Sequence, residues 1–186
     1  MHTYDRNYFK IALPAALEGL FMILLASTDL IMVGALGALS IAAVSIFMQP
    51  RLILLCFSRS LASSVTLLVS QKAGAGDTNG TSDIMKKSLT LCAIFMGLLH
   101  ILFYIFLDDI FYLMGANDEY MAEAMAYGPI ALAAVYVTSL TLILQAVQLG
   151  YGRTSVIMKT NVCGNVVNLA LNALLIFGFG PIPSLG

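Results

Sequence analysis

Apolar and polar positions divide the chain into five long hydrophobic stretches separated by short polar connections. The stretches cover residues 9–33, 40–67, 88–107, 127–149 and 155–177. Each is close to the roughly 20 residues that a helix needs to cross about 30 Å of hydrocarbon, so the pattern predicts five membrane-spanning helices. The first stretch is longer than the apolar region of a signal peptide, which has about 7 to 15 residues, and it contains acidic residues. We therefore expect it to remain in the mature chain.

The composition supports a membrane protein. Of the 186 residues, 60% are hydrophobic and only 10% are charged, whereas a soluble domain carries about 25% charged residues. We therefore expect an all-α, polytopic membrane helix bundle. The net charge of -1 provides no basic field for nucleic acid. The three cysteines are Cys56, Cys92 and Cys163. None has a His or Cys at metal-ligand spacing, so we expect no metal site. We expect the three side chains to be small residues of the core.

The positive charges predict the orientation. They fall in the N-terminal segment and in the second and fourth connections, at Arg6, Lys10, Lys72, Lys86, Lys87, Arg153 and Lys159. The first and third connections, residues 34–39 and 108–126, contain no Lys or Arg. Because cytoplasmic loops carry the excess of Lys and Arg, we expect a multi-pass protein of the cell membrane with a cytoplasmic N-terminus.

Four ionisable side chains fall inside the predicted spans: Glu18, Asp29, Arg51 and Arg59. Charged groups in hydrocarbon are costly and are functional candidates by default. Asp29 has no Lys or Arg at its own depth, so we expect it to be functional. Glu18 lies near the inner end of its helix, where we expect a structural ion pair with Arg51 or Arg59. The alternative is that these three side chains line a substrate cavity.

The last span carries a stripe of amides at Asn161, Asn165, Asn168 and Asn172, which share a face about 60° wide. Asp29 and Asn172 each lie about 18 residues from the inner end of their helices, or roughly 27 Å of rise, so we expect them at the same height. Carboxylate and amide oxygens suit a proton or a hard cation such as Na⁺. The alternative is that the amides serve as hydrogen-bonded contacts between helices.

Two other features of the spans carry expectations. Pro14 lacks a backbone donor and should bend the first helix before Asp29, unless it is simply tolerated in the first turn. His100 and the aromatic residues Phe103, Tyr104 and Phe106 are expected to form an interfacial belt at the outer end of the third helix.

Short motifs in a fixed order are similar to the N-terminal part of the multidrug and toxic compound extrusion (MATE) family of antiporters. They are ALP at 12–14, DLIMVG at 29–34, AAV at 42–44, LVSQ at 68–71, GAGD at 74–77, LMGA at 113–116 and LIFG at 175–178. Each is weak alone. Their order and spacing across nearly the whole chain make the resemblance specific.

The resemblance implies a protein of about twelve helices in two lobes, which exports cationic or amphipathic compounds in exchange for H⁺ or Na⁺. Residues 1–186 would form a partial N-terminal transmembrane lobe. Asp29 and Asn168 would bind the coupling ion, and the first helix would bend at Pro14. The partners implied are an export substrate, the lipid bilayer and the remaining helices of the full-length transporter.

The chain departs from the family pattern at Asn172, at two arginines, and at the turn Gly150-Tyr151-Gly152-Arg153, which stands in place of a Gly-Asp-Thr-Arg-like turn. Relatives often carry Asp at the position of Asn172, so the site here would have one carboxylate fewer, which favours a single proton over Na⁺. Arg51 and Arg59 stand where many relatives are apolar.

The leading hypothesis is a secondary active exporter that works by alternating access, with no cofactor other than the coupling ion H⁺ or Na⁺. The alternatives are a lipid-linked oligosaccharide flippase, in which Arg51 and Arg59 would meet a pyrophosphate, and a non-transporting membrane scaffold subunit. An enzyme is disfavoured, because the sequence has no paired-carboxylate, HExxH or Ser/His/Asp arrangement.

Overall fold

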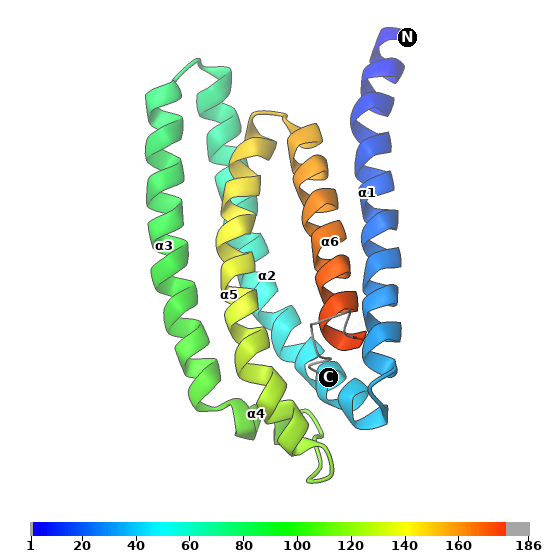
Figure 1. Ribbon diagram of the computed structural model, residues 1–186. Coiled ribbons are helices and arrows are strands. Elements are labelled where there is room, and N and C mark those ends of the chain that lie inside the picture. Colours follow the sequence, from blue (N-terminus) through cyan, green and yellow to red (C-terminus); the bar gives the residue numbers. More distant parts are fainter. Residues whose placement is uncertain (1, 178–186) are drawn as a thin grey trace. The chain divides into compact units, whose positions relative to one another are not determined.

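The computed structural model describes residues 2–177, with the side chains of residues 13, 16, 17 and 19–176. These residues form six helices and no strand (Figure 1). The helices are α1 His2–Gly34, α2 Ala38–Gly74, α3 Thr78–Ile105, α4 Leu107–Leu113, α5 Met121–Gly150 and α6 Thr154–Phe177. The expected all-α class is confirmed.

The helices extend beyond most of the predicted spans, and the third span also ends differently. The stretch 88–107 is not one helix, because α3 ends before Phe106 and the short helix α4 begins at Leu107. The sequence pattern missed α4, since Asp108 and Asp109 make this connection look like a polar loop. Leu107 and Phe111, four residues apart, nevertheless share one helical face and are buried, at 1% and 0% exposed.

Three helices of the described residues are long and apolar enough to cross a membrane: α2, α3 and α5. A shorter apolar helical segment covers Gly19–Gly34 of α1. With 37 residues, α2 rises about 55 Å, well beyond the hydrocarbon thickness. A helix suits this setting because it satisfies its own backbone polar groups where no water is present.

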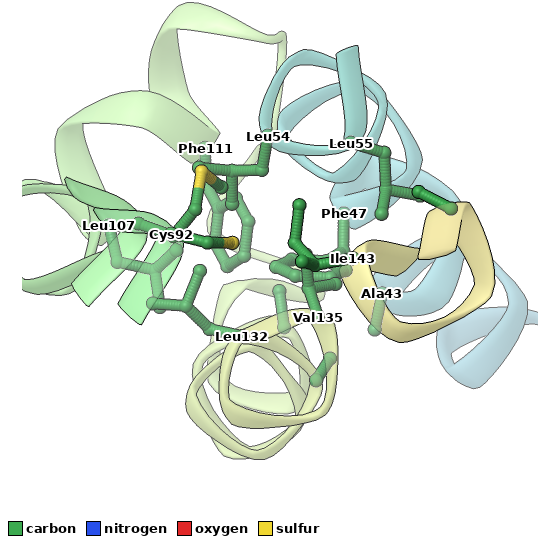
Figure 2. Close-up of a cluster of buried hydrophobic side chains, with 14 of the residues drawn as sticks. Ala43, Phe47, Leu54, Leu55, Cys92, Leu107, Phe111, Leu132, Val135 and Ile143 are labelled. Atoms are coloured by element: carbon green, nitrogen blue, oxygen red, sulfur yellow. The ribbon is translucent and has the colours of Figure 1, made fainter. Parts of the chain in front are cut away.

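The chain folds as two compact units, α2 to α5 in one and α1 with α6 in the other. In the first unit α2 packs against both α5 and α3. Figure 2 shows the core of this unit, a cluster of buried side chains that includes Phe47 of α2, Cys92 of α3, Phe111 of α4 and Ile143 of α5. The Phe47 ring meets the rings of Phe111 and Tyr127 edge to face, at centroid distances of 6.5 and 5.8 Å. Such close packing drives helix association in membranes, where lipid is as apolar as the core.

Buried hydroxyl groups join the same three helices. Ser58 Oγ of α2 donates to Ser139 Oγ of α5 at 2.7 Å, and Ser139 Oγ donates to the Val135 carbonyl. On α3 the Cys92 thiol donates to the Ser139 carbonyl at 3.7 Å. Both serines are fully buried. These bonds satisfy polar atoms that hydrocarbon would leave without partners.

The turn between α2 and α3 uses the GAGD motif. Gly76 adopts a φ of 73°, in the left-handed region that glycine tolerates best. Asp77 then caps α3, because its carboxylate accepts a hydrogen bond from the Gly80 N–H at 2.8 Å and pairs with Lys72 Nζ at 3.0 Å. The Gly80 bond, and next the Lys72 bond, hold the pKa of Asp77 below its ordinary value of 3.8.

A lowered folded-state pKa means that the cap stabilises the fold above pH 3.8 and that this contribution is lost as the pH falls through the folded-state pKa. We expect Asp77→Ala to speed amide exchange in the first turn of α3 at pH 7, measured by hydrogen–deuterium exchange mass spectrometry. Asp77→Asn keeps a cap acceptor and should exchange more slowly than Asp77→Ala. Equal protection of this turn in all three proteins at pH 7 would contradict the capping role.

Gly150 lets α5 approach α2 closely. A Cβ at this position would lie 2.6 Å from Val69 Cγ1 and 3.0 Å from the Thr66 carbonyl oxygen. Val69 is fully buried, so it has no room to move aside. At the same contact Thr66 Oγ1 donates to the Ala146 carbonyl at 3.2 Å.

We expect Gly150→Ala to lower the free energy of unfolding by about 1–3 kcal/mol, because the added methyl overpacks the contact. The matched control is Gly97→Ala, whose Cβ would lie at an ordinary 3.8 Å from Tyr136. The control should be neutral or gain up to about 1 kcal/mol from helix propensity. Unfolding of the purified protein in mixed micelles measures the free energy of unfolding of both variants. Equal effects would show that the α2–α5 contact has room for the added methyl group.

Candidate functional site

The unit of α1 and α6 brings Asp29, Asn168 and Asn172 together. Asn172 Nδ2 donates to Asp29 Oδ1 at 3.1 Å and lies 3.2 Å from Asn168 Oδ1, to which it also donates. Asp29 and Asn172 are half-buried, and Asn168 is exposed. Asn168 and Asn172 are one turn apart on α6, so one amide can bond both its helical neighbour and the carboxylate of α1.

A second contact fixes the register of the two helices. Asn165 Nδ2 of α6 lies 2.7 Å from Met22 Sδ of α1. This pair and the Asn172–Asp29 pair both join residues 143 apart in sequence, so α1 and α6 run parallel. The two contacts are seven residues apart on each helix, which is about two turns and returns to the same face.

Two residues of the amide stripe of α6 therefore face α1. Asn165 meets Met22, Asn172 meets Asp29, and Asn161 also has a bonding partner. Equal height for Asp29 and Asn172 was expected on the assumption that both helices start on the same side of the membrane. Parallel helices with this register place the two side chains as that assumption requires.

The donor set around Asp29 determines its chemistry. One carboxylate oxygen, Oδ1, accepts the Asn172 amide. Within the described part of the chain, Oδ2 receives no hydrogen bond. Nearby hydroxyls are used in their own helix, because Ser27 and Thr28 donate to the Ile23 and Leu24 carbonyls. Oδ2 is thus the oxygen that can take a proton or ligate a cation.

Arg51 and Arg59 lie on α2, in the other unit, and both are exposed. The ion pairs among the described residues are Lys72–Asp77 and Lys87–Asp83. The side chains of Glu18 and Pro14 are outside the described residues. The Glu18 ion pair and the bend at Pro14 therefore stay predictions.

The expectation of an interfacial position for His100 is wrong. His100 is only 7% exposed, its Nδ1 lies 2.7 Å from the Met96 carbonyl oxygen, and its ring meets Tyr136 edge to face at 5.4 Å. Tyr104 and Phe106 are exposed, as a belt requires. The signal was present in the sequence, since Cys92, Met96 and His100 recur every four residues and share the buried face of α3.

The cysteine expectation holds for one residue of three. All three are free thiols, but only Cys92 is buried, whereas Cys56 and Cys163 are exposed. In the part of the chain that the structure describes, no three His, Cys, Asp or Glu side chains gather at metal-binding distance.

Comparison with known proteins places this architecture among membrane transporters. The family model described as MatE matches residues 14–174. A Rhizobium meliloti protein named "Probable multidrug resistance protein NorM" is 28% identical over 184 residues, covering 99% of this chain and 39% of that protein. A Shewanella oneidensis protein named "FAD transporter" is 25% identical over 186 residues, covering 97% of this chain and 40% of that protein.

A solved structure has the same fold. The crystal structure described as MATE in the bent conformation superposes with a TM-score of 0.82 at 24% identity, covering 94% of this chain and 40% of that chain. The chain is thus an all-helical membrane protein of transporter architecture. It belongs to the MatE family, whose model matches most of its length. It spans about 40% of the length of the relatives it matches.

The Asn172–Asp29 contact predicts the effect of a second carboxylate. In Asn172→Asp two carboxyl groups would share the site, and both cannot ionise unless a cation neutralises them. We expect Na⁺ to raise the Tm of this variant, since a ligand that binds only the folded state stabilises it. In matched K⁺ and choline solutions the variant should show no such gain. A Tm of Asn172→Asp that is insensitive to Na⁺ would show that the two side chains do not form one site.

Proposed function

We propose that this chain is the N-terminal part of a secondary active exporter, which moves drugs or amphipathic metabolites outward in exchange for a coupling ion. The contact between the intramembrane Asp29 and Asn172 is the observation that carries the proposal. Membership of the MatE family and relatives named for multidrug resistance support export as the direction. The N-terminus is cytoplasmic, and the remaining helices of the transporter complete the path. The activity is transport rather than catalysis.

Coupling follows from the hydrogen-bond chemistry of Asp29. An ionised carboxylate only accepts hydrogen bonds, so it pairs with Asn172 Nδ2. A protonated carboxyl also donates, and the amide can turn to offer its oxygen, which ends its bond to Asn168. Ion binding thus changes the contact between α1 and α6. Only an ion with different affinity for two states can shift the balance between them, which is what alternating access needs.

The coupling ion in this proposal is H⁺. The described residues give the site one carboxylate and amide groups, whereas a hard cation binds best where several oxygens, often with more than one negative charge, surround it. Na⁺ is the second candidate, with Asp29 Oδ2 and the Asn168 carbonyl as ligands. The two ions differ in their dependence on pH and Na⁺ concentration.

We expect Asp29→Asn in the full-length protein to lower efflux of a fluorescent cation at least tenfold, because a neutral amide cannot take up the coupling ion. Accumulation of ethidium in a host without its own exporters measures this, at several values of pH and Na⁺. Ser27→Ala is the matched control. Its hydroxyl bonds within α1, so efflux should be unchanged.

Each outcome has a distinct meaning. Loss of efflux with an unchanged amount of protein in the membrane supports Asp29 as the coupling residue, and dependence on pH without Na⁺ identifies H⁺. If efflux persists in Asp29→Asn, the coupling residue lies in another part of the transporter. If the unmodified protein moves no cation under any gradient, the exporter proposal fails, and a flippase or a scaffold subunit takes its place.

A further inference from the structure

The register of α1 and α6 extends beyond the two contacts that define it. Met22 meets Asn165 and Asp29 meets Asn172, and the residues of each pair are 143 apart in sequence. The same offset places Glu18 of α1 opposite Asn161 of α6. Both positions come 11 residues before the Asp29–Asn172 pair, which is about three turns and about 16 Å of rise.

Asn161 belongs to the face of α6 that meets α1. At 100° per residue it lies about 20° from Asn172 and about 40° from Asn165 around the helix. Half-buried positions recur along this face every three or four residues. They are Met158, Asn161, Asn165, Leu169 and Asn172. Asn161 therefore lies on the α1 side of α6.

The matching face of α1 reaches Glu18. Buried and half-buried positions recur every three or four residues at Phe21, Leu25, Thr28 and Met32. Continued toward the N-terminus, this period gives position 17 or position 18. Leu17 is 55% exposed, so position 18 is the one that continues the face.

Within Thr154–Phe177, no cation lies on the face that meets α1. The ionisable side chains of this helix are Lys159 and Cys163, and both are exposed. Each is two residues from Asn161, which turns it about 160° away. On α1, Lys10 comes about two turns before Glu18 and about 80° around the helix. Across the contact, position 18 thus faces an amide rather than a cation, as Asp29 does.

We propose that Glu18 and Asn161 form a second ion-binding site, here called the inner site, which takes up the coupling proton between Asp29 and the cytoplasm. The inference rests on the proposed export function and adds a site to the path of its ion. The proton leaves the Asp29 carboxyl group, adds to a Glu18 carboxylate oxygen and leaves from there to cytoplasmic water. A rise of about 16 Å between the two carboxyl groups is too long for direct transfer, so water carries the proton between them.

The amide of Asn161 suits both forms of the Glu18 carboxyl group. An ionised Glu18 accepts a hydrogen bond from Asn161 Nδ2, and a protonated Glu18 donates one to Asn161 Oδ1. Asn165 and Asn168 follow along α6 at intervals of four and three residues. Their amide groups offer donors and acceptors to water between the inner site and Asp29.

Cross-linking tests the placement of the inner site. Pairs of cysteines are introduced into the full-length protein, in which the native cysteines have been replaced by serine. We expect Glu18→Cys with Asn161→Cys to form a disulfide as readily as Met22→Cys with Asn165→Cys, which reports a contact of the structure. The matched control is Glu18→Cys with only Cys163 retained, because Cys163 is on the far side of α6 and should not react.

Two cross-linking results would overturn the inference. One is equal reaction of the 18–161 and 18–163 pairs, because position 18 would then have no preferred face of α6. The other is a 18–161 pair that does not react although the 22–165 pair does.

Proton movement tests the role of the inner site. The full-length protein is placed in liposomes that contain the pH-sensitive dye pyranine, and an ethidium gradient drives the exchange. We expect Glu18→Gln to slow proton movement at least tenfold, because an amide cannot take up the proton. Glu18→Asp should keep part of the activity, since the carboxylate remains. Thr160→Ala is the matched control, because its hydroxyl bonds within α6, and it should be unchanged.

An exchanged variant tests the pairing itself. Glu18→Gln combined with Asn161→Asp returns a carboxylate to the inner site from the other helix, so we expect it to regain part of the proton movement. Unchanged proton movement in Glu18→Gln overturns the inference. So does a loss that the exchanged variant does not restore and that Arg51→Gln or Arg59→Gln reproduces, because Glu18 would then be the partner of an arginine.

Asp29→Asn keeps the two proposals apart. If it stops ethidium-driven proton movement and Glu18→Gln does not, the exporter proposal stands and the inner site is removed. If the unmodified protein couples no proton movement to ethidium, the exporter proposal fails and the role of the inner site fails with it. The cross-linking result then still decides whether Glu18 and Asn161 are paired.

Discussion

The need to give every polar group in hydrocarbon a partner is the constraint on which the rest of this structure depends. Asp29 is the clearest case, because an intramembrane carboxylate is costly unless donors reach it. The donor is Asn172 of α6, at 3.1 Å, and this bond and the Asn165–Met22 contact together set the register of α1 and α6. In the proposed function the same bond responds to the coupling ion, since protonation or cation binding at Asp29 would change the hydrogen bonds that its carboxyl group can accept.

The other unit solves the same problem in two ways. Where α2, α3 and α5 meet, Ser58, Ser139 and the Cys92 thiol satisfy one another in a fully buried network. On the side away from α3, Arg59 and its polar neighbours stay exposed. The first arrangement holds the helices together, and Gly150 supports it by letting α5 come close to α2. The second leaves a charged side chain exposed.

Family membership and local geometry contribute different parts of the argument. The MatE match and the similar crystal structure define the fold. The specific residues refine it, because this chain pairs its first-helix carboxylate with an amide and carries two arginines on α2. The carboxylate and its amide neighbours are the feature on which the proposed coupling rests. Both features are local chemistry on a shared scaffold, which is where function is specified.

The sequence by itself determined the helical class, the long apolar segments and the set of polar residues that needed partners. These follow from hydrophobic length and helical periodicity, which are local properties of the chain. It also allowed Asp29 and Asn172 to be placed at one height, because rise per residue is fixed. Tertiary structure decided what periodicity does not contain: that Phe106 ends α3 and α4 follows, that His100 is buried against Tyr136 rather than interfacial, and that Asn172 is the amide that reaches Asp29. Those outcomes depend on which faces of different helices meet, and a face acquires its neighbours only when the helices pack.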